Sequence, residues 1–106
     1  MSNNLTFLQY DVEASQFRLP SADTSYVALG LIGEVGELYG AWAKTIRDNG
    51  ELDHTAVKKE LGDILWFLTA LCRDLDTSIS EVATMNIQKL SKRAAKGTLQ
   101  GSGDDR

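Results

Sequence analysis

The chain has 106 residues, of which 42% are hydrophobic and 25% are charged, and this size and composition are typical of one globular domain. The net charge of -4 disfavours nonspecific nucleic-acid binding, which depends on clustered lysine and arginine. We expect no membrane span and no secretory signal, because no apolar run reaches ~18 residues and the N-terminus lacks a basic-then-apolar layout. The only cysteine, Cys72, has no disulfide partner within the chain and predicts a packed thiol in a cytoplasmic protein.

Helical periodicity dominates the chain, in which Pro20 is the only proline. The first predicted helix covers residues 5–18 and ends in "LPSADTS". The second covers residues 24–48 and ends at Asn49-Gly50, a strong stop signal. The stripe of the first helix consists of Phe7, Tyr10, Ala14 and Phe17. The stripe of the second is predicted to face inward and consists of Val27, Leu31, Val35, Leu38, Trp42 and Ile46.

Two further helices are predicted over residues 54–75 and 79–95. Ser78 and Glu81 have the spacing of a capping box at the start of the last helix, and Gly97 ends it. Strand-type alternation is absent from the sequence, so we predict an all-α, four-helix bundle-like domain over residues 1–97 and a flexible tail over 98–106. Aromatic residues on several helix faces predict that a second copy covers apolar surface, as a homodimer or homotetramer.

Two pairs of acidic residues stand beside the apolar stripes of the predicted second and third helices. Glu34 and Glu37 are three residues apart, and neither has a lysine or arginine three or four positions away. Glu60 and Asp63 repeat this spacing on the next helix. Residues three apart are neighbours on a helix surface, so antiparallel packing of the two helices would bring four carboxylates together.

Such a cluster raises the pKa values of its members unless a cation neutralises it. Oxygen ligands without histidine or cysteine suit a hard ion, which predicts Mg²⁺ with Mn²⁺ as a substitute. The alternative is a solvated acidic face, and Lys59 has the spacing to pair with Asp63. A row of glycines also lies on one side of the second helix, which favours close backbone packing or room for a ligand. It consists of Gly30, Gly33, Gly36 and Gly40.

The order Glu34-x-x-Glu37 and then Glu60-x-x-Asp63 resembles the E-x-x-E…E-x-x-D signature of the MazG-like, all-α nucleoside triphosphate pyrophosphohydrolases. The flanking sequences "LGLIGEVGELYGAWAK" and "VKKELGDILWFL" are also similar to that family, and the resemblance extends over about residues 25–95. It implies Mg²⁺-dependent hydrolysis of a (deoxy)nucleoside triphosphate to the monophosphate and pyrophosphate, in nucleotide-pool control or house-cleaning. The four acids would be metal ligands, and one of them or a nearby acid would deprotonate the attacking water.

The same resemblance points to an asparagine and a lysine on the following helix, and "MNIQKLSKR" supplies candidates. Asn86, Lys89 and Arg93 share one helical face and would contact phosphate oxygens, although cations there also suit a solvated face. Lys44 and Arg47 are a second candidate phosphate clamp, or they complement the dipole at the end of the second helix.

The tail "GTLQGSGDDR" resembles endings of small phage-type members of the family. It would either close over a nucleotide, with Asp104 and Arg106 reaching the substrate, or remain disordered. Two other functions stay open. One is phosphoribosyl-ATP pyrophosphohydrolase, which shares the acidic scaffold; the other is a non-catalytic helical oligomerisation or regulatory module.

Overall fold

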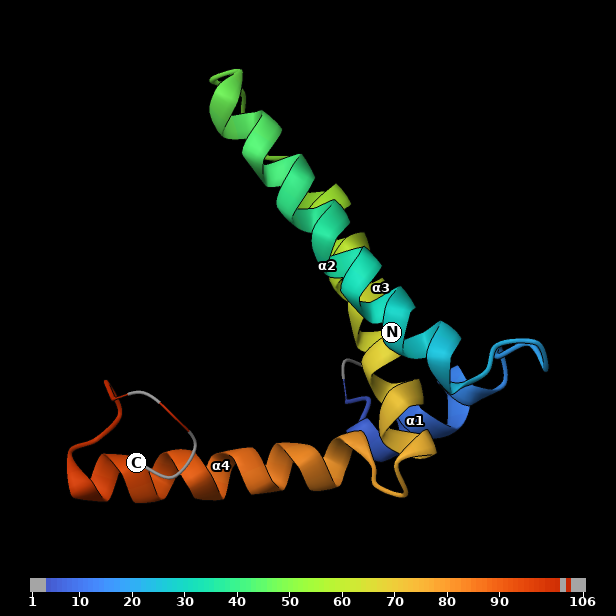
Figure 1. Cartoon of the computed structure of the whole chain (residues 1–106), viewed down its shortest axis with the longest axis vertical. Coiled ribbons are helices and arrows are strands. Elements are labelled where there is room, and N and C mark those ends of the chain that lie inside the picture. Colours follow the sequence, from blue (N-terminus) through green and yellow to red (C-terminus); the bar gives the residue numbers. More distant parts are fainter. Residues whose placement is uncertain (1–3, 102, 104–106) are drawn as a thin grey trace.

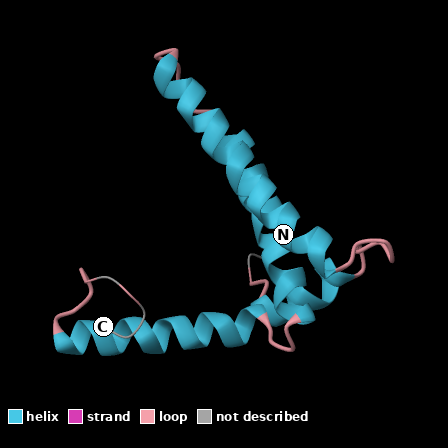
Figure 2. Cartoon of the chain, in the orientation of Figure 1, coloured by secondary structure: helices cyan, strands magenta, loops and turns pink. Residues whose placement is uncertain are grey.

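The computed structural model describes residues 4–101 and 103, and this part of the chain contains four α-helices and no strand (Figures 1 and 2). They are α1 (Phe7–Ser15), α2 (Thr24–Arg47), α3 (His54–Asp74) and α4 (Ile79–Lys96). The predicted all-α fold class is confirmed. None of these helices is both long enough and apolar enough to cross a membrane.

The helix boundaries follow from side-chain caps. Asp23, Asp53 and Ser78 each accept a hydrogen bond from the backbone N–H three residues on, which satisfies a donor that the first turn leaves open. Thr6 forms a reciprocal capping box with Gln9 at the start of α1. Gly97 ends α4 with a φ of 72°, a left-handed conformation that glycine adopts without steric cost.

Helix α1 is shorter than the predicted range 5–18. Its N-terminus is set at Phe7 by the Thr6 cap. After Ser15 the amides of Phe17 and Arg18 bond to carbonyls three residues back instead of four, so the chain tightens into turns before Pro20. The other three helices begin and end within one residue of their predicted bounds.

Helices α2 and α3 form a long antiparallel hairpin, which is the main body of the structure (Figure 1). At its base, an added Cβ on Gly30 would stand 2.3 Å from the ring of Phe67, so glycine is required for this approach. The Phe67 ring also packs against Tyr26, at 6.0 Å between centroids, and edge-on against Trp66, at 5.2 Å. The contacts of Phe67 with Gly30 and Tyr26 cross from α3 to α2 and fix the register of the hairpin at the end nearer α1.

Polar contacts hold α1 and the loop after it to α3. The indole N–H of Trp66 donates to the carbonyl of Ala14 at 3.0 Å, and Arg73 bonds both the carboxylate and the carbonyl of the buried Asp11. Arg18 forms a bidentate pair with Asp74 at 2.7 and 2.8 Å. This pair lowers the pKa of Asp74 to about 2.

Helix α4 contacts α1 and α3 but not α2, within the part of the chain that the structure describes. Figure 1 shows it leaving the base of the hairpin at a steep angle and extending away from it. Most of the length of α4 is therefore not covered by the other helices of the same chain.

The buried apolar core of one chain is small, and its members are Ala14, Val27, Ala70, Cys72 and Ile79. Burial raises the pKa of the Cys72 thiol, as expected for a packed, inert cysteine. The prediction that the whole α2 stripe faces inward is wrong for one chain, because Val35, Trp42 and Ile46 are exposed, Trp42 to 45%. The C-terminal half of α2 extends away from α1 and α4, so neither helix of the same chain covers it (Figure 1).

Candidate active site

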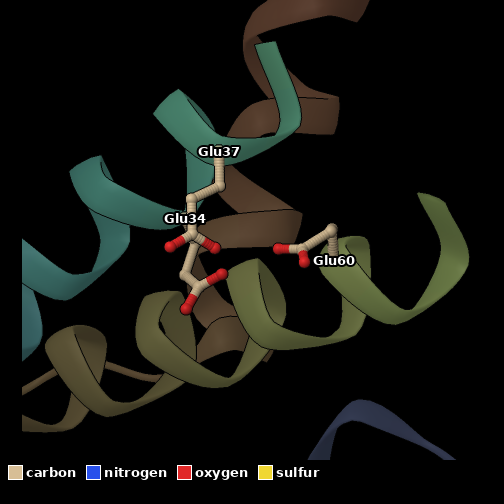
Figure 3. Close-up of side chains that lie close together, drawn as sticks. All are labelled: Glu34, Glu37 and Glu60. Carbon is tan, nitrogen blue, oxygen red and sulfur yellow. The ribbon is translucent and has the colours of Figure 1, made fainter. Parts of the chain in front are cut away.

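Three carboxylates converge in the middle of the hairpin. Glu34 and Glu37 come from adjacent turns of α2, and Glu60 comes from the facing surface of α3 (Figure 3). One oxygen of each lies within 4.8 Å of the others. The predicted convergence of acids from the second and third helices is therefore present for these three residues.

The cluster has an unusual protonation state. A hydrogen bond with Glu60, together with burial and the negative charges of Glu37, Glu60 and Asp63, raises the pKa of Glu34 to about 7. Without a cation, Glu34 therefore keeps a proton at pH values where an ordinary glutamate is ionised.

Glu60 supplies a second sign that the cluster is incomplete by itself. Its Oε2 atom is buried and has no hydrogen-bond partner among the residues that the structure describes. A buried carboxylate oxygen without a partner is costly, and a bound cation would satisfy it. The residues thus fit a hard divalent ion: three carboxylates within reach of one point, oxygen donors only, and one oxygen left unsatisfied.

Asp63, the fourth predicted acid, does not join the group of three. It is exposed, and its charge is near enough to act on both Glu34 and Tyr10. Burial and then the charge of Asp63 raise the pKa of the Tyr10 hydroxyl. The alternative pairing of Lys59 with Asp63 is absent from the ion pairs of the described residues.

Sequence reasoning placed Tyr10 in an apolar stripe and missed that the charge of Asp63 acts on its hydroxyl. No spacing rule connects the two residues, because α1 and α3 meet only through the tertiary fold. The half-buried position of Tyr10 is visible only in the structure.

The two candidate phosphate clamps lie apart from the carboxylates of the same chain. Lys44 and Arg47 are exposed toward the far end of α2, where Arg47 pairs with Asp48 at 2.8 Å. On α4, Asn86 and Lys89 line a shallow hollow of about 250 Å³ together with Val82 and Met85. Because α4 does not contact α2, one chain does not bring this hollow to Glu34 and Glu37.

Arg93 lies further along α4 and is buried. Its Nη2 atom donates to the carbonyl of Gly103 at 3.2 Å, and the Thr98 hydroxyl donates to the Arg93 carbonyl at 3.4 Å. The described part of the tail therefore folds back over the end of α4. Asp104 and Arg106, which the sequence suggested as substrate contacts, lie outside the described residues.

Comparison with known proteins identifies a family for this arrangement. Residues 23–98 match the sequence model of the MazG nucleotide pyrophosphohydrolase domain, which includes α2, α3 and α4. The chain is 38% identical over 86 residues to the Gene 37 protein of Mycobacterium phage L5, an alignment that covers 77% of this chain and 75% of the phage protein. No solved structure matches significantly.

Proposed function

The chain belongs to the MazG nucleotide pyrophosphohydrolase family, and we propose that it hydrolyses a nucleoside or deoxynucleoside triphosphate to the monophosphate and pyrophosphate. The observation that carries this proposal is the cluster of Glu34, Glu37 and Glu60, with its retained proton and its unsatisfied buried oxygen. The matching cofactor is Mg²⁺, with Mn²⁺ as a substitute, because both ions bind carboxylate oxygens as ligands.

The three clustered carboxylates are the proposed metal ligands. A bound divalent ion would draw charge from the phosphate oxygens and stabilise the departing pyrophosphate. Asp63 is exposed beside the cluster, which suits an acid that orients the attacking water and accepts its proton. Water then breaks the anhydride between the α- and β-phosphoryl groups, and the bridging oxygen leaves with pyrophosphate.

We further propose that the active form is a homodimer or homotetramer. One chain buries few apolar residues and leaves many large ones exposed, among them Leu29, Ile32, Tyr39 and Ile46 on α2 and Met85, Ile87 and Leu90 on α4. Exposed apolar surface of this extent is typical of subunit interfaces. Packing α4 of one copy over the hairpin of another would cover both faces and complete the bundle.

This assembly would also complete the site. Within one chain, Asn86 and Lys89 on α4 stay away from the carboxylates, so a second copy is the proposed source of these phosphate contacts. Lys89 would neutralise phosphate oxygens, and Asn86 would donate hydrogen bonds to them. The other three cations stay secondary candidates. Arg93 is covered by the tail, and Arg47 already pairs with Asp48. Lys44 is exposed near Arg47, toward the far end of α2.

The test is release of pyrophosphate from a panel of ribo- and deoxynucleoside triphosphates, with Mg²⁺ and with chelator. We expect metal-dependent release from one or a few nucleotides, and loss of that release in Glu37→Gln. Glu51→Gln, which changes an exposed acid in the turn between α2 and α3, is the matched control.

Two other outcomes point elsewhere. Release only from phosphoribosyl-ATP would assign the chain to that alternative reaction, which uses the same acidic scaffold. No release from any substrate, combined with a melting temperature that does not respond to Mg²⁺, would support a non-catalytic oligomerisation or regulatory module.

A further inference from the structure

An aromatic hollow lies at the base of the hairpin, below the carboxylates. It has a volume of about 200 Å³ and is lined by Phe17, Leu19, Ser21, Ala22, Tyr26 and Trp66. Three separate segments contribute to it: the loop after α1, the first turn of α2 and the middle of α3. None of these residues belongs to the acidic motif.

One wall of the hollow is held firmly. Tyr26 packs against Phe67, and Phe67 packs edge-on against Trp66. The Trp66 indole N–H is in turn fixed by the carbonyl of Ala14. The opposite side is open, because the Phe17 side chain is 76% exposed and buries little of its surface within its own chain. The hollow thus presents flat rings, a fixed wall and an accessible side.

The hollow is aligned with the proposed reaction site along both helices of the hairpin. At 1.5 Å per residue, Glu34 lies about 12 Å along α2 from Tyr26, and Glu60 about 9 Å along α3 from Trp66. On α2, Tyr26, Gly33 and Glu37 recur at intervals of seven and four residues, so they share one face. An added Cβ on Gly33 would meet nothing within 4 Å, so α2 is open at this glycine, whereas Gly30, one turn nearer Tyr26, is covered by the Phe67 ring.

We infer that the hollow lined by Phe17, Tyr26 and Trp66 receives the nucleobase of the substrate, while its triphosphate extends along α2 to the carboxylates. This inference rests on the proposed function. A nucleobase is flat and stacks on aromatic rings, and its phosphates would extend over the roughly 9–12 Å that separate the hollow from the carboxylates along the two helices. The hydroxyls of Ser21 and Tyr26 are the polar groups on the lining that are suited to hydrogen-bond the base edge.

Tryptophan fluorescence tests this inference without any reaction. The chain has two tryptophans, so Trp66 is the only one left in a Trp42→Phe variant. Nucleosides, which lack phosphate, are titrated into this variant in chelator. We expect saturable quenching by one or a few nucleosides, because a base stacked in the hollow lies against the indole. Phe17→Ala in the same background should weaken the apparent affinity about tenfold.

A matched control separates the loss of stacking in the hollow from the general effect of removing an exposed phenylalanine ring. Phe7 is also a phenylalanine of the first segment and is 47% exposed, but it does not line the hollow. Phe7→Ala should therefore leave nucleoside quenching unchanged. In the pyrophosphate assay, Phe17→Ala should raise KM for the preferred nucleotide about tenfold and leave kcat within about twofold, since base stacking is a binding contact.

Three results would overturn the inference: no nucleoside quenches Trp66, or Phe17→Ala and Phe7→Ala have the same KM, or Phe17→Ala dissociates the oligomer without changing KM. The last result would mean that an apolar side chain of a second copy fills the hollow. Failure of the proposed function gives a different pattern, because absence of pyrophosphate release from every nucleotide leaves the nucleoside titration unaffected.

Discussion

Glu34 on α2 and Glu60 on α3 face each other across the hairpin, and the hydrogen bond between them keeps a proton on Glu34. A divalent cation that binds the cluster must displace this proton. Metal binding, protonation and folding stability are therefore linked at one place in the structure.

The first prediction concerns pH. The folded-state pKa of Glu34 is raised from 4.5 to about 7, so its contribution to folding is fully present below pH 4.5 and is lost as pH rises through about 7. Thermal melting in chelator should thus show lower stability at pH 8 than at pH 5. Addition of Mg²⁺ should raise the melting temperature more at pH 8 than at pH 5, because Glu34 is mostly ionised at pH 8 and the ion does not have to displace its proton.

Glu34→Gln provides the check on this assignment. The amide keeps the shape of the protonated carboxyl but does not titrate, so the fall in metal-free stability between pH 5 and pH 8 should become smaller. An unchanged pH profile in Glu34→Gln would show that another group carries the effect.

The second prediction separates the two kinds of acid in the site. Glu37→Gln removes a clustered ligand and should abolish both pyrophosphate release and stabilisation by Mg²⁺. Asp63→Asn changes an acid outside the cluster of three, so it should abolish turnover while most of the Mg²⁺-dependent shift in melting temperature is kept. Circular dichroism should show unchanged helical content in both. Near-normal turnover in either variant would remove that residue from the site.

Much of this site follows from sequence, because its parts are local to single helices. The bounds of α2, α3 and α4 are set by short-range caps such as Asp23 and Gly97, whose preferences are strong. The convergence of Glu34, Glu37 and Glu60 needs only the i, i+3 spacing and one antiparallel hairpin.

The remaining features depend on how elements are placed in space. Nothing in the periodicity of α4 indicates that it leaves the hairpin and carries Asn86 away from the carboxylates. The apolar stripe that contains Trp42 correctly predicted a helix, but Trp42 is exposed in one chain. Periodicity does not distinguish a stripe that packs in the core from one that a second copy would cover. The charge of Asp63 acts on Tyr10 because α1 and α3 come together in the tertiary fold, which no local pattern encodes.

The third prediction concerns the attachment of α1 to α3. Arg73→Ala removes both hydrogen bonds to Asp11 and leaves a buried carboxylate without its cation. We expect it to lower the free energy of unfolding by about 2–3 kcal/mol, less than for a fully buried pair because the Arg73 side chain is partly exposed. Arg47→Ala is the matched control. Its pair with Asp48 is open to solvent on both sides, so stability by chemical denaturation should hardly change.

The fourth prediction uses two helical glycines in different surroundings. Gly30→Ala would force its Cβ into the Phe67 ring and should destabilise the hairpin by about 1–3 kcal/mol. Gly62→Ala has no neighbour within 4 Å of the new Cβ, so its better helix propensity should add about 0.5–1 kcal/mol. Denaturant titration of the two variants checks both signs. Equal effects would mean that Phe67 does not pack on α2 as described.

The last prediction tests whether α4 acts on the site of another copy. Glu37→Gln and the double variant Asn86→Ala/Lys89→Ala should each be inactive as pure proteins. When the two are unfolded together and refolded as a mixture, a mixed dimer would contain one site with intact carboxylates and an intact α4 from the other chain. Random pairing should then restore about a quarter of the wild-type pyrophosphate release in a two-fold symmetric dimer. If α4 served the carboxylates of its own chain, every site in the mixture would carry a defect and no activity would return. That result would contradict the proposed assembly while leaving the carboxylate cluster as the metal site.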